Sequence, residues 1–157
     1  MGKAAAGVCI DGAPPAGILP TQWSFLKANW PVLNPLKGNS VFYPTKNWFY
    51  YAFGNNLTRE ESDKAFEEFA VPESRNIPRG AVKKFGKVDF KKPYAPLLFI
   101  AGEKDPIIPQ GRNKKNFRAY KDVNSIKDFK LFENRGYFIC GDKNREEVAG
   151  YVYNWIK

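Results

Sequence analysis

The sequence predicts an α/β fold in which a parallel sheet of about three strands is flanked by helices and joined to a separate helical segment. Three observations predict it. Residues 4–11 and 97–101 are apolar runs without polar alternation, which is typical of strands buried on both faces. Residues 91–157 show the order strand, helix, strand, helix, as in parallel sheets covered by helices. Residues 19–90 instead carry scattered aromatic residues, many prolines and short helical patterns.

The first strand is expected in AAAGVCID, from Ala4 to Asp11, where small and β-branched residues follow each other. The sequence DGAPPAG ends it, because proline and glycine favour turns. We assign residues 1–18 to this strand and its exit loop.

Residues 19–90 are expected to form a helical, aromatic-rich layer. Its clearest helix follows Thr58, since Thr58 and Glu61 have the spacing of a capping box. Ala65, Phe66 and Phe69 then form one apolar stripe, expected in the core, and the helix should end before Pro72.

Residues 91–157 contain the most apolar strand, Leu97 to Ala101, which we expect at the centre of the sheet. A helix over residues 112–121, with Phe117 and Tyr120 facing inward, and a strand over 128–133 should follow. The last helix is expected to use Asn144 as its N-cap with Glu147 three residues on. Its apolar face has helical spacing and comprises Val148, Tyr151, Val152 and Trp155.

Composition restricts the classes of function. The chain has 157 residues, 43% hydrophobic and 16% aromatic, so one globular domain is expected. Its formal charge of +9 is interpreted as a solvated basic surface. There is no histidine, and Cys9 and Cys140 lie far apart, so no metal site, cofactor or disulfide framework is predicted. With neither an export signal nor an apolar span in the sequence, we expect a cytoplasmic protein without membrane contact.

Nucleic acid is not an expected partner. Lysines and aromatic residues mingle in KKNFRAYK, residues 114–121, but no groove-reading motif accompanies them. Inward packing of Phe117 and Tyr120 accounts for that spacing. No glycine-rich phosphate loop follows a strand and opens a helix.

Two stretches carry a family resemblance. PLLFIAGEKDPIIP, followed by FKLFENRGYFICG and a final amphipathic helix, resembles the C-terminal half of the α/β-hydrolase fold. In that family the acid of the catalytic triad lies in a Gly-x-x-Asp-x-x-x-Pro pattern after the penultimate strand, which implies Asp105 as the acid. The family histidine follows the last strand, and its position falls on Tyr137. The resemblance also implies that residues 4–11 are the strand after the nucleophile's helix, and that residues 19–90 are the cap.

The departures from the family concern the catalytic groups. The family's serine stands in a Gly-x-Ser-x-Gly elbow, and no such segment is present. The nearest approach, GNSVF around Ser40, has Phe42 for the second glycine and no strand before it. A tyrosine with an ordinary pKa near 10 is a proton donor at neutral pH, so Tyr137 cannot replace the histidine as base. We interpret Tyr137 as a packing residue and Asp105 as vestigial. Asp11 is a further carboxylate expected at the same edge of the sheet.

These observations predict a non-catalytic α/β-hydrolase-like protein that acts by association. The strand at residues 4–11 would lack its neighbour, the nucleophile strand, and an open apolar edge invites pairing. The expected partner is a second copy of the chain, as a homodimer, or a complementary N-terminal hydrolase half. Two alternatives stay open. One is a hydrolase of esters or related acyl substrates completed by a partner that brings the serine, and the other is a basic surface-binding module.

Overall fold

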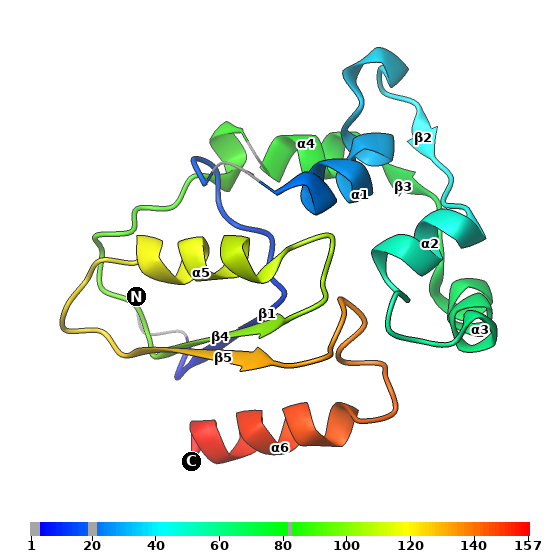
Figure 1. Cartoon of the computed structure of the whole chain (residues 1–157). Helices are drawn as coiled ribbons and strands as arrows, with labels where there is room; N and C mark the ends of the chain where they lie inside the picture. The colour runs from blue at the N-terminus through cyan, green and yellow to red at the C-terminus, as the bar shows by residue number, and fades with distance from the viewer. Residues whose placement is uncertain (1–3, 19–21, 82) are drawn as a thin grey trace.

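The computed structural model describes residues 4–18, 22–81 and 83–157. Its main sheet has three parallel strands in the order β1 (Gly7–Ile10), β4 (Leu97–Gly102) and β5 (Lys127–Phe132). Gly7 is aligned with Leu97, and Leu97 with Lys127. The predicted central position of the 97–101 strand is therefore confirmed (Figure 1).

The first strand is shorter than predicted. It spans Gly7–Ile10 rather than residues 4–11, and its residues are half-buried, not buried on both faces. The reason lies in the strand order, because β1 pairs with β4 on one edge and no described strand pairs with its other edge.

One helix covers each face of the sheet (Figure 1). Helix α5 (Gln110–Ala119) packs on one face and α6 (Arg145–Ile156) on the other. Leu98 and Ile100 of β4 are fully buried in the cluster that includes Val148 of α6. Phe99, which alternates with them, contacts Phe117 with ring centres 5.8 Å apart, so the inward position predicted for Phe117 is confirmed.

The final helix begins at the predicted N-cap residue but lacks the predicted capping-box contacts. Asn144 is the N-cap residue, but its side chain makes no capping hydrogen bond. Asp142 orders the turn before the helix, since its Oδ1 accepts from the Asn144 backbone N–H at 2.9 Å. Glu147 binds Arg135 instead of the helix end. The predicted apolar face is confirmed, with Tyr151, Val152 and Trp155 packed beside buried Val148.

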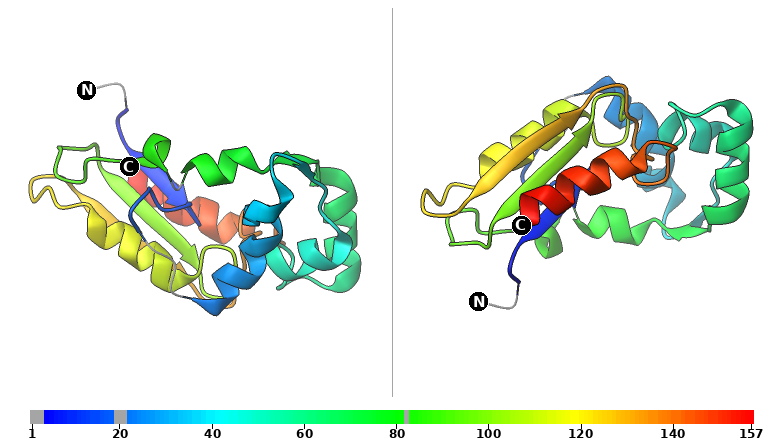
Figure 2. Two further views of the ribbon diagram at one scale, coloured as in Figure 1. Left: turned by 90° about the horizontal axis from the view of Figure 1, so that it is seen from above. Right: turned by 90° about the horizontal axis from the view of Figure 1, so that it is seen from below.

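Residues 22–81 and 83–90, which we call the cap, lie between β1 and β4 in the chain and contain short helices and one pair of short strands. Figure 2 shows that α2 and α3 lie together at the end of the molecule toward which the strands point. The cap's elements, in order, are α1 (Trp23–Leu33), η1 (Pro35–Lys37), β2 (Val41–Phe42), α2 (Lys46–Ala52), α3 (Arg59–Phe69), β3 (Glu73–Ser74), α4 (Asn76–Ala81) and η2 (Lys84–Gly86). The antiparallel pair β2 and β3 was not predicted. With two residues per strand, it gives no periodic pattern in the sequence.

Helix α3 begins with the predicted capping box. The Thr58 hydroxyl accepts from the Glu61 N–H, and the Glu61 carboxylate accepts from the Thr58 N–H at 2.8 Å. Ala65 is buried as expected, but Phe69 is 55% exposed, so its assignment to the core was wrong. The ring centres of Phe69 and Phe138 are 6.0 Å apart. Phe69 lines a cavity, and a side chain in a cavity wall remains partly exposed to solvent.

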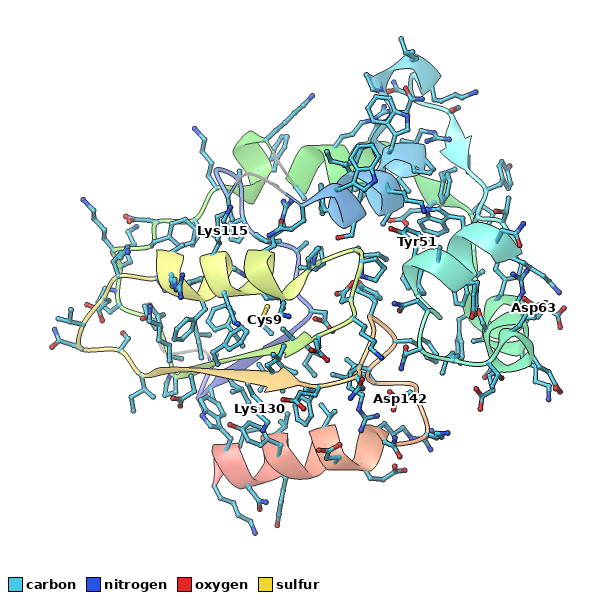
Figure 3. All side chains as sticks on the ribbon, viewed as in Figure 1. Cys9, Tyr51, Asp63, Lys115, Lys130 and Asp142 are labelled. Atoms are coloured by element: carbon cyan, nitrogen blue, oxygen red, sulfur yellow. The ribbon has the colours of Figure 1, made fainter. Side chains whose placement is uncertain are left out.

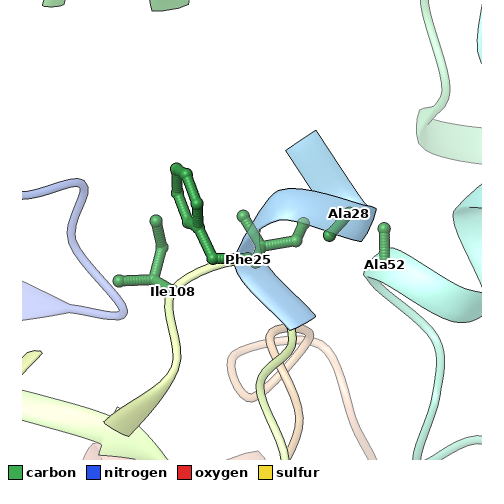
Figure 4. Close-up of a cluster of buried hydrophobic side chains, with 5 residues drawn as sticks. Phe25, Ala28, Ala52 and Ile108 are labelled. Atoms are coloured by element: carbon green, nitrogen blue, oxygen red, sulfur yellow. The ribbon is translucent and has the colours of Figure 1, made fainter. Parts of the chain in front are cut away.

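A small apolar cluster joins the cap to the core. Phe25 and Ala28 of α1 and Ala52 of α2 pack with Ile107 and Ile108, which belong to the loop after β4 (Figure 4). This contact places the cap against the loop that carries Asp105.

Candidate functional site

The loop after β4 holds Asp105 in a fixed orientation. Its carboxylate Oδ1 accepts hydrogen bonds from the backbone N–H groups of Ile107, at 2.7 Å, and Ile108, at 3.0 Å. Asp105 is only 3% exposed. The predicted position, directly after the central strand, is therefore the observed one, and its backbone bonds give the carboxyl group a role in ordering the loop.

Asp11 ends β1 in a conformation that few residues other than glycine adopt. Its φ is +41°, in the left-handed region. Its N–H donates to the Ile100 carbonyl at 2.9 Å, and its Oδ1 accepts from the Gly102 N–H at 2.9 Å and from Asn113 Nδ2 at 3.3 Å. The backbone bond and the two side-chain bonds together hold Asp11 at the carboxyl edge of the sheet. The expected second carboxyl group is thus present beside Asp105.

The two carboxyl groups form a buried pair. In each, Oδ2 is buried and receives no hydrogen bond from an N–H or hydroxyl donor of the described residues. Burial, the charge of Asp105 and a hydrogen bond to Asp105 raise the pKa of Asp11 to about 8. Burial raises the pKa of Asp105 to about 6, although the Ile107 and Ile108 N–H groups act in the opposite direction. Near neutral pH the pair therefore holds one proton and one negative charge.

Tyr137 follows β5 and lies close to this pair. Its ring packs edge-on against Phe53 of the cap, with centres 4.9 Å apart. Burial, together with the charges of Asp105 and Asp11, raises the pKa of its hydroxyl above the ordinary value. The side chain also packs against the apolar cluster that joins the cap to the core. Tyr137 is a protonated packing residue in this structure.

A cavity of about 430 Å³ lies between the cap and the carboxyl edge of the sheet. Asp11 and Tyr137 line it on the core side, and its walls are mainly aromatic. The rings around it belong to Phe42, Trp48, Phe49, Phe53, Phe69, Tyr137 and Phe138. This volume is within the range, about 300–1,000 Å³, of pockets that hold small molecules.

The described residues that line the cavity differ from a serine–histidine site. No serine is among the described residues that line it. Cys140 does line it, but burial and the neighbouring charges of Asp11 and Asp142 raise the pKa of the thiol, which keeps it protonated. The cavity therefore presents neither an activated nucleophile nor a base of the histidine type.

The loop between β5 and α6, which carries Tyr137, is held by an ion-pair network that the sequence analysis did not find. Arg135 Nη1 donates to both carboxylate oxygens of Asp142, at 2.7 and 2.8 Å, and its Nη2 donates to Glu147 at 2.6 Å. Asp142 is labelled beside this loop in Figure 3. Because the network joins the loop to the first turn of α6, it fixes the position of Tyr137.

Two glycines let the loops approach each other. A Cβ at Gly102 would lie 2.8 Å from the backbone oxygens of Arg135 and Gly136. A Cβ at Gly136 would lie 2.4 Å from the Asn55 side chain in the cap. At Gly102 any side chain would collide with backbone, whereas at Gly136 a side chain would have to displace the ends of the Asn55 and Asn56 side chains.

Across residues 4–18, 22–81 and 83–157, no group of three or more acidic or cysteine side chains is placed to hold a metal ion. Within the same ranges, none of the helices has the length and apolar character needed to cross a bilayer.

Comparison with known proteins identifies the fold. No protein-family model and no curated protein sequence matches the chain. Polyneuridine aldehyde esterase superposes with a TM-score of 0.59 at 13% identity, covering 96% of this chain and 62% of the esterase. A monoacylglycerol lipase from Paleococcus ferrophilus superposes with a TM-score of 0.56 at 16% identity, covering 99% of this chain and 59% of the lipase. The chain has a partial α/β-hydrolase fold, as the sequence predicted, and spans about three fifths of these structures.

Proposed function

We propose that this chain is a non-catalytic α/β-hydrolase-like protein that binds a small molecule in the cavity under its cap and associates through the open edge of β1. The observation that carries the first part is the chemistry of the cavity: it is large enough for a ligand, yet Tyr137 stands where hydrolysis needs a base. The proximity of Asp105 does not change this, because a carboxylate beside a phenol of raised pKa does not make the phenol a proton acceptor.

The first expected result concerns ester hydrolysis. Hydrolysis of a 4-nitrophenyl ester by the isolated chain should stay at the rate of a matched solution of lysine and cysteine. Tyr137→His should hydrolyse no faster, because a base without a nucleophile and an oxyanion hole has no reaction to assist. A rate above that background, abolished by a serine-directed inhibitor, would show that this chain holds an active nucleophile.

Association is proposed from the surface beside β1. The outer edge of β1 pairs with no described strand, and an apolar groove runs between this strand and α6. Tyr153 and Ile156, which line the groove, are 60% and 58% exposed. Unpaired backbone groups next to apolar side chains favour pairing with another chain. A twofold homodimer is the simplest partner, since the same patch then meets itself.

The second expected result is self-association of the isolated chain. Light scattering across a concentration series should show the mean mass rising toward that of a dimer. Replacing both Tyr153 and Ile156 with glutamate should weaken dimerisation by at least about tenfold, because charges would enter an apolar interface. Tyr43→Glu is the matched control, since Tyr43 is 68% exposed and does not line the groove. A monomer at every concentration would refute the homodimer and leave a separate partner for this edge.

A further inference from the structure

We propose that the cavity under the cap is specific for an organic cation, a small ammonium group carrying apolar substituents. This inference rests on the proposed ligand-binding function and names the class of ligand. Three features of the cavity support it: the sign of its charges, the unpaired carboxyl oxygen within it, and its aromatic walls.

The sign of the charges in the cavity is opposite to that of the whole chain. The formal charge of the protein is +9. Nevertheless, the described residues that line the cavity include no lysine or arginine, whereas Asp11 and Glu73 are both among them. A ligand that enters therefore meets acidic groups at close range, and a cation is favoured over an anion.

Asp11 provides a specific contact point. Its side chain lines the cavity although the residue is only 4% exposed, and its Oδ2 receives no hydrogen bond from a donor of the described residues. Apart from the proton shared with Asp105, the Asp11 carboxyl group therefore has an oxygen that can accept a further hydrogen bond. An ammonium group at this place would supply the missing counter-charge, and an ammonium bearing an N–H would also supply the donor.

The aromatic walls of the cavity suit the apolar substituents of such an ammonium group. Phe42, Trp48 and Phe53 lie in sequence edge to face, with ring centres 4.8 and 5.4 Å apart, and Phe53 meets Tyr137 in the same way. The faces of aromatic rings attract cations, and ammonium ions with methyl groups bind in cages of this kind. The guanidinium of Arg75, which does not line the cavity, lies 5.2 Å from the centre of the Phe42 ring, so the rings left for a ligand cation are mainly Trp48, Phe53 and Tyr137.

Affinity for a cation should rise with pH. The titratable groups near Asp11 are Asp105 in the loop after β4, Tyr137 and Cys140 in the loop after β5, Cys9 on β1, and Glu73 on β3. The pKa of Asp105 is raised to about 6 and that of Asp11 to about 8, so the carboxyl pair gains negative charge through this range. A quaternary ammonium ion does not titrate. Any change in its affinity with pH therefore comes from a change in the protonation of the protein.

The test compares two probes of the same shape, phenyltrimethylammonium and neutral tert-butylbenzene. Binding is followed by NMR, from the shifts of backbone amides that line the cavity. We expect the cation to bind at least about tenfold more tightly than its neutral analogue at pH 8. We also expect this preference to shrink as the pH is lowered to about 5, where both carboxyl groups are protonated.

Variants show which side chains of the cavity cause the preference for the cation. Asp11→Asn keeps the size of the side chain and removes the charge that Asp11 gains as the pH rises through its pKa of about 8. At pH 9 it should therefore reduce affinity for the cation by about tenfold while leaving tert-butylbenzene unchanged. Glu73→Gln, at an exposed position of the cavity wall, provides a second test and should reduce affinity for the cation by a smaller factor. Glu60→Gln is the control, because Glu60 lies on the exposed side of α3 and does not line the cavity.

The outcomes separate this inference from the proposed function. Equal affinity for the two probes, unaffected by Asp11→Asn and Glu73→Gln, would overturn the cation specificity and leave a neutral apolar ligand for the cavity. Failure of both probes to shift the cavity amides would overturn the proposed ligand binding itself.

Discussion

Asp142→Ala is expected to lower the free energy of unfolding by about 3–5 kcal/mol. Asp142 accepts two hydrogen bonds from Arg135, whose side chain is 8% exposed, and one from the Asn144 N–H in the turn before α6. Without the carboxylate, a buried guanidinium keeps only its bonds to Glu147, which is mostly exposed, and to the Asn144 carbonyl. The loss therefore combines the main partner of a buried charge with a bond that orders the start of α6. Urea denaturation, followed by far-ultraviolet circular dichroism, measures it.

Glu146→Ala is the control for this prediction. Glu146 lies one turn away, has a side chain that is 74% exposed, and approaches Arg145 at 3.6 Å. Removing such a surface pair should change the free energy of unfolding by less than about 1 kcal/mol. If Asp142→Ala lowered the free energy of unfolding by no more than Glu146→Ala does, the Arg135 network would not hold the loop that positions Tyr137.

Asp11→Asn is expected to make the protein more stable above neutral pH. The pKa of Asp11 is about 8 in the folded chain, because burial and Asp105 disfavour its charge, against about 3.9 in an unfolded chain. A carboxyl group with a raised folded pKa contributes stability that is present in full below the unfolded pKa and is lost as the pH rises through the folded one. The wild-type protein should therefore lose stability between about pH 4 and pH 8. The Asp11→Asn variant should lose much less, because its amide side chain carries no charge.

The measurement is a series of urea denaturations from pH 4 to pH 9. The difference between Asp11→Asn and the wild type should grow with pH to several kcal/mol, at about 1.4 kcal/mol for each unit of pKa shift. Glu60→Gln, at a fully solvated position, should follow the wild-type curve. A wild-type stability that rises with pH across this range would mean that Asp11 is charged in the folded protein and that the carboxyl pair does not share a proton.

Features encoded by local patterns could be predicted from the sequence. The Leu97–Gly102 strand is recognisable because a central strand buried on both faces is apolar at every position. The capping box of α3 is recognisable because its two partners, Thr58 and Glu61, have a fixed spacing. The place of Asp105 followed from the end of its strand and from the family pattern around it.

Features that depend on distant contacts could not be predicted in this way. The sequence gives Asn144 and Glu147 the spacing of a capping box, yet Asp142 and Arg135 compete for these roles through the loop before α6. Phe69 continues an apolar stripe, but it faces a cavity whose other walls come from distant segments. The shared proton of Asp11 and Asp105 depends on burial and on their closeness in space, which neither residue's neighbours in the sequence reveal.

The central claim, a hydrolase fold without hydrolytic machinery in this chain, is tested most directly by intact-protein mass spectrometry after treatment with a fluorophosphonate. This reagent forms a covalent adduct with an activated serine. We predict that the mass of the folded chain stays unchanged over a time that fully labels an active serine hydrolase in a parallel sample. A stoichiometric adduct, mapped by peptide sequencing to a residue of this chain and lost on unfolding, would contradict the account.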